Sequence, residues 1–360
     1  MHIQKLTLTN YKNISSKSFD FKSSINCFVG NNGVGKSNIL DSIYHLAFGK
    51  SFFNPTSVQN IKFDKTFFVI EGNFLIKSRV EKINCSYKKG QKKVLKRNNK
   101  IYNKISEHIG LIPLVMISPD DIDLINKGSS FRRKFLDSIL GQIHSDYLTN
   151  LLSYNKVLAQ RNSLLKYFAL NHTYDQKSVD IYNDQLEKFG LPIFDKRKEF
   201  MKIFSPLFKK RYEAMNSGNE KVKLNYVSAL EKDSLSELLS KSLNKDRIFQ
   251  YTTEGIHKDD LDFLIHEKPI KKFGSQGQKK TFLISLKIAQ FDYLRNEKGM
   301  SPIILLDDIF DKLDQKRVTN LLKLILEEGF GQIFLSDTHE DRTLNALESI
   351  KSDFEFFKLD

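Results

Sequence analysis

Residues 30–37, GNNGVGKS, decide the fold that this 360-residue sequence predicts. They fit the pattern GxxxxGK[ST], with a short apolar run, INCFV, before them at 25–29 and an amphipathic helix expected over 37–48. Glycines let backbone N–H groups curl around a phosphate, and the helix N-terminus adds its partial positive charge. With strand, spacing, lysine and helix all in place, a chance glycine-rich turn is the weaker interpretation. The residues predicted to bind a nucleotide here are Gly30, Asn31, Asn32, Gly33, Val34, Gly35, Lys36 and Ser37.

Lys36 is expected to reach the β- and γ-phosphates of ATP, and the Ser37 hydroxyl to ligate Mg²⁺. Further along, the apolar run 303–306 reads IILL and ends in Asp307 and Asp308. In a parallel sheet, the carboxyl end of such a strand lies at the edge where the nucleotide loop also opens. We therefore predict that Asp307 holds Mg²⁺ and that Asp308 orients or deprotonates the attacking water. Without the upstream loop, the same pair would be interpreted as a helix cap.

The predicted type of secondary structure changes twice along the chain. Residues 1–115 alternate strand patterns with one helix, and their stretch 66–100 reads as a strand meander with a turn at Lys88-Lys89-Gly90. Residues 250–360 return to α/β alternation, with helices over 277–297 and 315–328 and strands at 303–306 and 332–336. Residues 116–249 carry apolar residues at helical spacing, with a second helical stretch at 178–216 broken near Gly190-Leu191-Pro192. The predicted fold class is α/β: a P-loop ATPase head built from both chain ends (1–115 plus 250–360), with a mainly helical lobe (116–249) inserted.

A second turn that could bind an anion opens the helix at 277–297. Ser275-Gln276-Gly277-Gln278 places a hydroxyl and free N–H groups at that helix start, although a simple Ser N-cap would look the same. The stretch resembles the signature motif of ABC-type ATPases, and Asp311-Lys312-Leu313-Asp314 resembles their D-loop. This resemblance implies that Ser275, Gly277 and Gln278 cap the γ-phosphate held by the P-loop of a second subunit, in an ATP-dependent homodimer.

Three further stretches resemble the RecF family, and the resemblance covers nearly the whole chain. They are 6–13 (LTLTNYKN), 117–124 (ISPDDIDL, followed by KG at 127–128 and RRKFLD at 132–137) and 255–261 (GIHKDDL). The departures are mild, with Ile256 where the family usually has Pro and Lys258 where it usually has Arg. In the last strand region, His339 is either a γ-phosphate sensor or a surface residue.

The resemblance implies an ATPase of DNA repair and replication that binds single- and double-stranded DNA without sequence preference. It implies slow ATP turnover that acts as a timer, and partners of the RecR and RecO type that direct RecA to gapped DNA after damage. Two other classes share parts of the pattern. An SMC or Rad50-type protein would separate its head motifs by hundreds of coiled-coil residues, and an importer ATPase usually carries Asp-Glu where this chain has Asp307-Asp308.

Charge supports a polyanionic partner, because 57 Lys and Arg outnumber 43 acidic residues and the net charge is +14. No run of 18 apolar residues and no secretory signal is present, so a cytoplasmic location without a membrane partner is expected. Three basic clusters are candidates for DNA contact, and each could equally be a solvated face. One is Lys88, Lys89, Lys92, Lys93, Lys96, Arg97 and Lys100; the others are Arg132, Arg133 and Lys134, and Lys196, Arg197, Lys198, Lys209, Lys210 and Arg211.

Overall fold

The computed structural model describes residues 1–216, 220–308, 331–348 and 353–360. Its internal contacts divide the chain into two compact units, residues 1–122 with 280–360 and residues 123–279. The sequence places 250–279 with the chain ends, whereas the structure places them in the second unit. The reason is strand β10 (Asp260–Ile265), which pairs with β9 (Val222–Val227) and whose Asp260 carboxylate receives two hydrogen bonds from Arg132.

A five-stranded parallel sheet forms the centre of the first unit, in the order β14-β3-β13-β12-β8. Three central strands and one edge strand are buried along their whole length, as expected for parallel strands covered on both faces. The predicted strands at 25–29 and 303–306 are both present. The bounds are β3 Ile25–Val29, β8 Leu114–Ile117, β12 Ile303–Leu306, β13 Ile333–Asp337 and β14 Phe354–Lys358.

A second, antiparallel sheet in the same unit has the order β2-β1-β4-β5-β6-β7. Strand β4 alternates buried and outward residues along its length, so one face of the sheet meets the core. The turn predicted around Gly90 joins β5 to β6. The bounds are β1 His2–Tyr11, β2 Ile14–Asp20, β4 Phe67–Ile76, β5 Arg79–Lys88, β6 Val94–Arg97 and β7 Lys100–Ile101.

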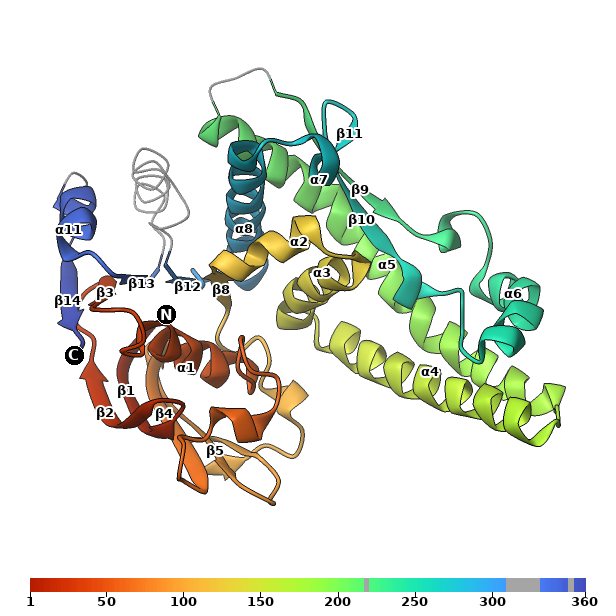
Figure 1. Cartoon of the computed structure of the whole chain (residues 1–360), viewed down its shortest axis with the longest axis horizontal. Coiled ribbons are helices and arrows are strands. Elements are labelled where there is room, and N and C mark those ends of the chain that lie inside the picture. The colour runs from red at the N-terminus through yellow and green to blue at the C-terminus, as the bar shows by residue number, and fades with distance from the viewer. Residues whose placement is uncertain (217–219, 309–330, 349–352) are drawn as a thin grey trace. The chain divides into compact units, whose positions relative to one another are not determined.

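Helix α1 (Lys36–Phe48) packs between these two sheets (Figure 1). Its Ile39, Leu40, Ile43 and Leu46 are buried in one apolar core with residues of both sheets. Because this core holds the helix on both sides, the loop that precedes the helix is anchored at a fixed place at the carboxyl edge of β3.

The second unit is built on a long antiparallel helix pair, α4 (Ser145–Asn171) and α5 (Gln176–Met215), with α6 near its tip (Figure 1). The predicted break near Gly190 is wrong, because α5 runs through Pro192 and Pro206 without interruption. Packing explains this: a Cβ at Gly190 would lie 2.9 Å from Leu235, so the glycine allows close contact with a neighbouring helix. The remaining bounds are α2 Asp123–Asn126, α3 Ser129–Ile143, α6 Leu235–Phe249, α7 Ile270–Phe273 and β11 Lys268–Pro269.

Helix α8 (Gln276–Lys298) crosses the boundary between the units in sequence, and α11 (Glu340–Glu348) follows β13. Five short 3-10 turns complete the described elements: Ser57–Asn60, Ile105–Glu107, Pro119–Ile122, Ala229–Glu231 and Ile256–Lys258. The predicted helix over 315–328 lies outside the described residues. Within the described ranges, no helix combines the length and apolarity needed to span a membrane.

Candidate nucleotide site and basic surfaces

The loop between β3 and α1 has the backbone that the sequence predicts. Gly33 and Gly35 have φ angles of +89° and +109°, a region that residues with a Cβ rarely adopt. A Cβ at Gly35 would also lie 2.9 Å from the Asn13 side chain. Helix α1 begins directly after Gly35, and no described side chain caps its N-terminus. Its first N–H groups are therefore left for an anion.

Lys36 is folded into this loop. Its side chain is buried, and the ammonium donates hydrogen bonds to the C=O of Gly30 (2.7 Å) and of Asn31 (2.9 Å). A positive charge is thus held inside the curl of the backbone, where the fold provides no carboxylate for it among the described residues. This is the arrangement needed to attract phosphate.

Asn13 braces the loop from the turn between β1 and β2. Its amide donates to the C=O of Gly33 (3.0 Å), and its carbonyl accepts from the Asn38 amide (2.8 Å). The backbone C=O of Asn13 accepts from the Lys62 ammonium (2.8 Å). Motif analysis of the loop does not find Asn13, since the residue lies 17 positions before Gly30 and belongs to no phosphate-binding pattern.

Behind the loop, Asp41 of α1 is fully buried and holds the helix in place. Its carboxylate accepts from the Tyr11 hydroxyl (2.8 Å) and the Ser51 hydroxyl (2.6 Å), and it pairs with the Lys12 ammonium at 2.5 Å. Four partners, including the Phe52 N–H at 2.6 Å, satisfy this buried charge. The LTLTNYKN stretch therefore supports the P-loop helix.

Asp307 and Asp308 follow β12 at the same sheet edge, as predicted. The Ser336 hydroxyl, from the neighbouring strand β13, lies 2.7 Å from Asp307 Oδ1 and 3.4 Å from Asp308 Oδ1, and accepts the Asp308 N–H at 2.9 Å. Ser336 is fully buried. The sequence analysis missed it, although a polar residue at the carboxyl end of an apolar strand was a usable signal.

The donors suit Mg²⁺. Burial raises the pKa of the Asp307 carboxyl, while hydrogen bonds from Ser336 and Ser37 oppose that rise. The Ser37 hydroxyl and the Asp307 carboxylate are therefore neighbours, and both are the oxygen ligands that Mg²⁺ prefers. Across the described ranges no cluster of three or more His, Cys, Asp or Glu could hold a metal.

Asp308 has a left-handed backbone, with φ of +43°. Asp and Asn are the residues besides Gly that adopt this region most readily. Together with the Ser336 contact, this backbone conformation fixes the direction in which the Asp308 side chain leaves the main chain. The expected D-loop at 311–314 lies outside the described residues.

The Ser275 turn belongs to the second unit and caps α8. The Ser275 hydroxyl accepts the Gln278 N–H (3.2 Å), the Gln278 side chain accepts the Ser275 N–H (2.7 Å), and the Gln278 amide donates to Glu220 (2.8 Å). Ser275 is exposed and Gly277 half-buried. The N-cap interpretation is thus realised in this structure, and an exposed hydroxyl remains compatible with the signature interpretation. His339 is exposed directly before α11, which leaves both of its interpretations open.

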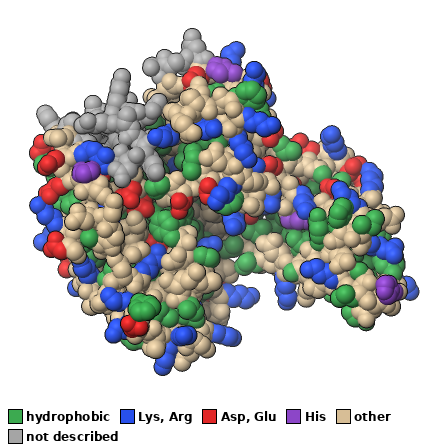
Figure 2. Space-filling view, in the orientation of Figure 1, with side chains coloured by type: hydrophobic (Ala, Val, Ile, Leu, Met, Phe, Trp, Pro, Cys, Tyr) green, Lys and Arg blue, Asp and Glu red, His purple; other side chains and the backbone are tan. Residues whose placement is uncertain are grey.

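In the helical basic clusters the arginines are held by internal contacts, whereas Lys134, Lys198, Lys209 and Lys210 are exposed. Arg132 pairs with Asp260, Arg133 donates to the C=O of Asp259, and buried Arg197 pairs with both Asp137 and Asp259. Arg211 is buried as well. These arginines hold the second unit together and are not available to phosphates. On the face shown in Figure 2, Lys and Arg side chains are spread among acidic ones instead of forming one patch.

The cluster at 88–100 also divides. Lys88, Lys89, Lys92 and Lys93 surround the β5–β6 turn, whereas Arg97 lies opposite Ile83 and is bound by Glu81 through two hydrogen bonds of 2.8 Å. The turn between β4 and β5, with Lys77 and Arg79, is at the opposite end of the ten-residue strand β5, about 30 Å from the β5–β6 turn. The register places the β5–β6 turn at the end of the sheet where Tyr11 and Asn13 approach the nucleotide loop.

Known proteins match this chain over its whole length. The family model described as AAA ATPase domain matches residues 1–342. The "DNA replication and repair protein RecF" of Flavobacterium johnsoniae is 56% identical, with both chains fully covered, and that of Parabacteroides distasonis is 44% identical, with 100% and 98% covered. Among solved structures, "the recombination mediator protein RecF-ATP in RecFOR pathway" superposes with a TM-score of 0.88 at 31% identity, covering 99% of this chain and 95% of that one. An Smc head, at 16% identity and a TM-score of 0.56 (96% and 92% covered), shares the fold alone.

Proposed function

The chain belongs to the RecF family of DNA replication and repair proteins and is an ATPase, and we propose that it binds DNA under the control of ATP in recombinational repair and replication restart. The observation that carries the proposal is the meeting of Lys36, Ser37 and Asp307 at one edge of a parallel sheet, in a chain of net charge +14. Because the proposed ligand is chromosomal DNA, we also propose that the protein acts in the cytoplasm.

In the proposed site, the loop N–H groups and Lys36 hold the phosphates of ATP. Ser37 and Asp307 hold Mg²⁺, which neutralises charge on the β- and γ-phosphates. Asp308 orients the attacking water, and Ser336 keeps both carboxylates in register through the contacts described above. We assign the ATPase lobe to the first unit, residues 1–122 with 280–360, and the helical lobe to the second unit, residues 123–279.

The Ser275 turn acts in trans in this proposal. Its hydroxyl, the N–H groups near Gly277 and the Gln278 side chain meet the γ-phosphate bound by the partner subunit's P-loop. Two such contacts form about a two-fold axis, so ATP holds the homodimer and hydrolysis releases it. Slow turnover then times the stay on DNA, where RecR- and RecO-type partners direct the recombinase RecA to gaps.

Sizing the full-length protein with and without ATP, Mg²⁺ and DNA tests this proposal. ATP and Mg²⁺ should convert a monomer into a dimer, and Ser275→Arg should bind ATP but remain monomeric. Mixing Ser275→Arg with Lys36→Ala protein leaves one complete composite site in each mixed dimer, so part of the ATPase activity should return. A Ser275→Arg protein that dimerises like the wild type would exclude the trans arrangement.

The β5–β6 turn is the proposed DNA contact, since its lysines are not tied up as the helical arginines are. Reversing Lys92 and Lys93 to Glu should weaken binding of a labelled duplex and reduce its salt dependence, by roughly one unit of slope for each lost phosphate contact. The matched control reverses Lys77 and Arg79 at the opposite turn of the same sheet. Equal losses in both variants would show a general charge effect and no local contact.

A further inference from the structure

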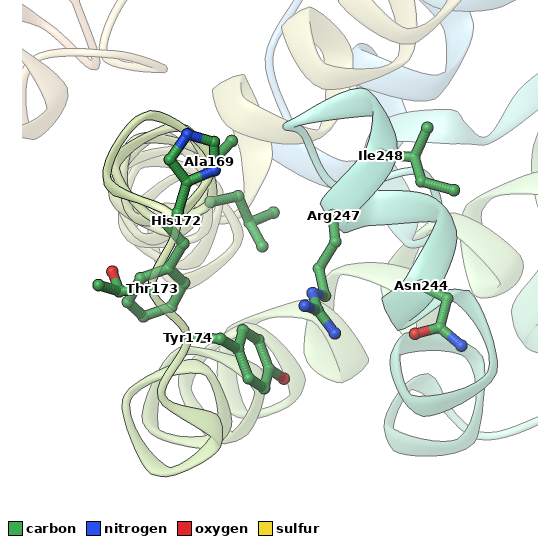
Figure 3. Close-up of a pocket in the computed structure, with 9 residues that line it drawn as sticks. Ala169, His172, Thr173, Tyr174, Asn244, Arg247 and Ile248 are labelled. Carbon is green, nitrogen blue, oxygen red and sulfur yellow. The ribbon is translucent and has the colours of Figure 1, made fainter.

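A pocket of about 580 Å³ opens at the tip of the second unit, far along the chain from every motif discussed above. The end of α4, the start of the turn into α5, and the last turn of α6 line it (Figure 3). Leu165, Phe168 and Ala169 line it from α4, and Arg247 and Ile248 line it from α6. The Arg247 side chain points toward Tyr174 (Figure 3). The pocket therefore combines an apolar surface with one cation.

The Arg247 side chain lies over the Tyr174 ring. Its guanidinium carbon is 4.2 Å from the centre of that ring, and the Phe168 and Tyr174 rings meet edge to face at 5.5 Å between centroids. The Arg247 side chain makes no hydrogen bond or ion pair with any residue that the structure describes. Its N–H groups are therefore available, and their fork matches a carboxylate or phosphate.

The carboxylates nearby are already committed to other groups. Asp246, next to Arg247 in sequence, is fully buried and pairs with Arg161 at 2.8 Å. Asp175 caps α5 through the N–H groups of Lys177 and Ser178. Asp180 accepts hydrogen bonds from the Gln176 and Asn183 amides. The Arg247 fork is therefore open to an anion from outside the chain.

The surroundings favour a protein over a nucleic acid as the source of that anion. Leu170 is 78% exposed, Ile248 77% and Tyr167 57%, on the same two helix ends. Large aliphatic side chains held in water at such exposures mark protein contacts, because they gain when covered by apolar side chains. A nucleic-acid surface would instead present aromatic faces along a basic track. Inside the pocket the Tyr174 face is covered by Arg247, and the exposed rings of Tyr167 and Phe249 are not among the residues that line it.

We propose that this pocket is a docking site for a short segment of a partner protein that carries an apolar side chain and a carboxylate within one helical turn of each other. The apolar side chain enters between Phe168, Ala169 and Ile248, and the carboxylate takes the fork of Arg247. The site is separate from nucleotide binding, so docking does not require ATP.

The probe for this proposal is a display library of random twelve-residue peptides, selected on immobilised full-length protein. Enriched peptides should pair Asp or Glu with Leu, Phe or Trp at a spacing of three or four positions. One such peptide is then labelled, and its affinity measured by fluorescence anisotropy. Affinity should fall at least about tenfold in Arg247→Ala, the size expected for an arginine anchor, and be lost in Ala169→Trp, which fills the pocket.

The matched control is Lys245→Ala, which removes the same charge from the same helix two residues away, outside the pocket; affinity should stay within about twofold. Peptide binding should also persist in Lys36→Ala. A failure of the proposed ATP-controlled DNA binding would therefore leave the peptide result unchanged, and the two proposals can be tested separately. Thermal unfolding of each variant checks the fold. The proposal would be overturned if the selected peptides showed no pairing of an acidic with an apolar residue. It would also be overturned if the labelled peptide bound Arg247→Ala and the wild type with equal affinity. Loss of labelled oligothymidylate binding in Arg247→Ala, with peptide binding intact, would assign the pocket to nucleic acid instead.

Discussion

Helices α1 and α8 both begin at a turn rich in Gly, Ser and polar residues, yet they differ in whether side chains cap their N-termini. No described side chain caps α1; its turn uses glycines at positive φ and contains a buried lysine. Helix α8 is closed by its own sequence, because Ser275 and Gln278 satisfy each other's N–H groups. The first terminus is built to receive an anion. The second is satisfied without a ligand, so a phosphate would have to exchange with its cap.

The largest expected effect is on the α1 terminus. Lys36→Ala removes the only charge inside the loop curl, and two charge-assisted hydrogen bonds of about 1.5–3 kcal/mol each imply roughly a 100-fold or greater loss of ATP affinity. Equilibrium titration with a fluorescent ATP analogue measures it. The control is Lys62→Ala, whose ammonium contacts the same support through Asn13 without entering the loop. Similar losses in both variants would mean that Lys36 only stiffens the loop.

Asp308→Asn should lower the hydrolysis rate by about 100-fold while ATP still binds, since general-base contributions are of this order. Asn tolerates the left-handed backbone of this position as Asp does, so the change isolates the charge. Steady-state phosphate release and the lifetime of the ATP-held dimer are the measurements. Wild-type turnover in the mutant would reduce Asp308 to a structural residue.

Ser336→Ala should have a smaller effect, through both carboxylates at once. The Asp308 N–H loses its acceptor and Asp307 loses a donor, so the Mg²⁺ concentration that supports half-maximal ATP binding should rise about tenfold, consistent with a cost of about 1–3 kcal/mol for an unsatisfied buried group. Ser336→Thr keeps the hydroxyl and should restore the Mg²⁺ dependence. An unaltered Mg²⁺ titration in Ser336→Ala would remove this residue from the site.

The smallest expected effect is on the α8 terminus in the isolated monomer. Ser275→Ala should leave monomer ATP affinity unchanged and lower unfolding stability by about 1 kcal/mol, the usual cost of losing an N-cap. Calorimetry and nucleotide titration together provide the check. If ATP affinity fell as far as in Lys36→Ala, the contrast between the two helix starts would be mistaken.

The sequence predicts what depends on local pattern. The P-loop, the apolar strands before Gly30 and Asp307, and the start of α8 are all where spacing places them. It fails where tertiary packing decides, as in the unbroken α5, because the contact between Gly190 and Leu235 joins segments 45 residues apart. Asn13 could not be ranked for the same reason, since its role comes from segments that meet only in the fold, whereas the place of Ser336 at the end of an apolar strand was a signal in the sequence. Charge alone also does not show that Arg132 and Arg197 already have partners, so the sequence could not rank the three basic clusters.

The fold of Lys36 onto the C=O groups of Gly30 and Asn31 has a consequence for selectivity. Any anion that draws the ammonium away must first replace two charge-assisted hydrogen bonds, each worth about 1.5–3 kcal/mol. A lone phosphate or a chloride makes too few contacts to compensate for these two hydrogen bonds. A triphosphate with its metal contacts the backbone N–H groups and the ammonium together. The loop therefore favours anions that make several contacts at once over anions that make only one.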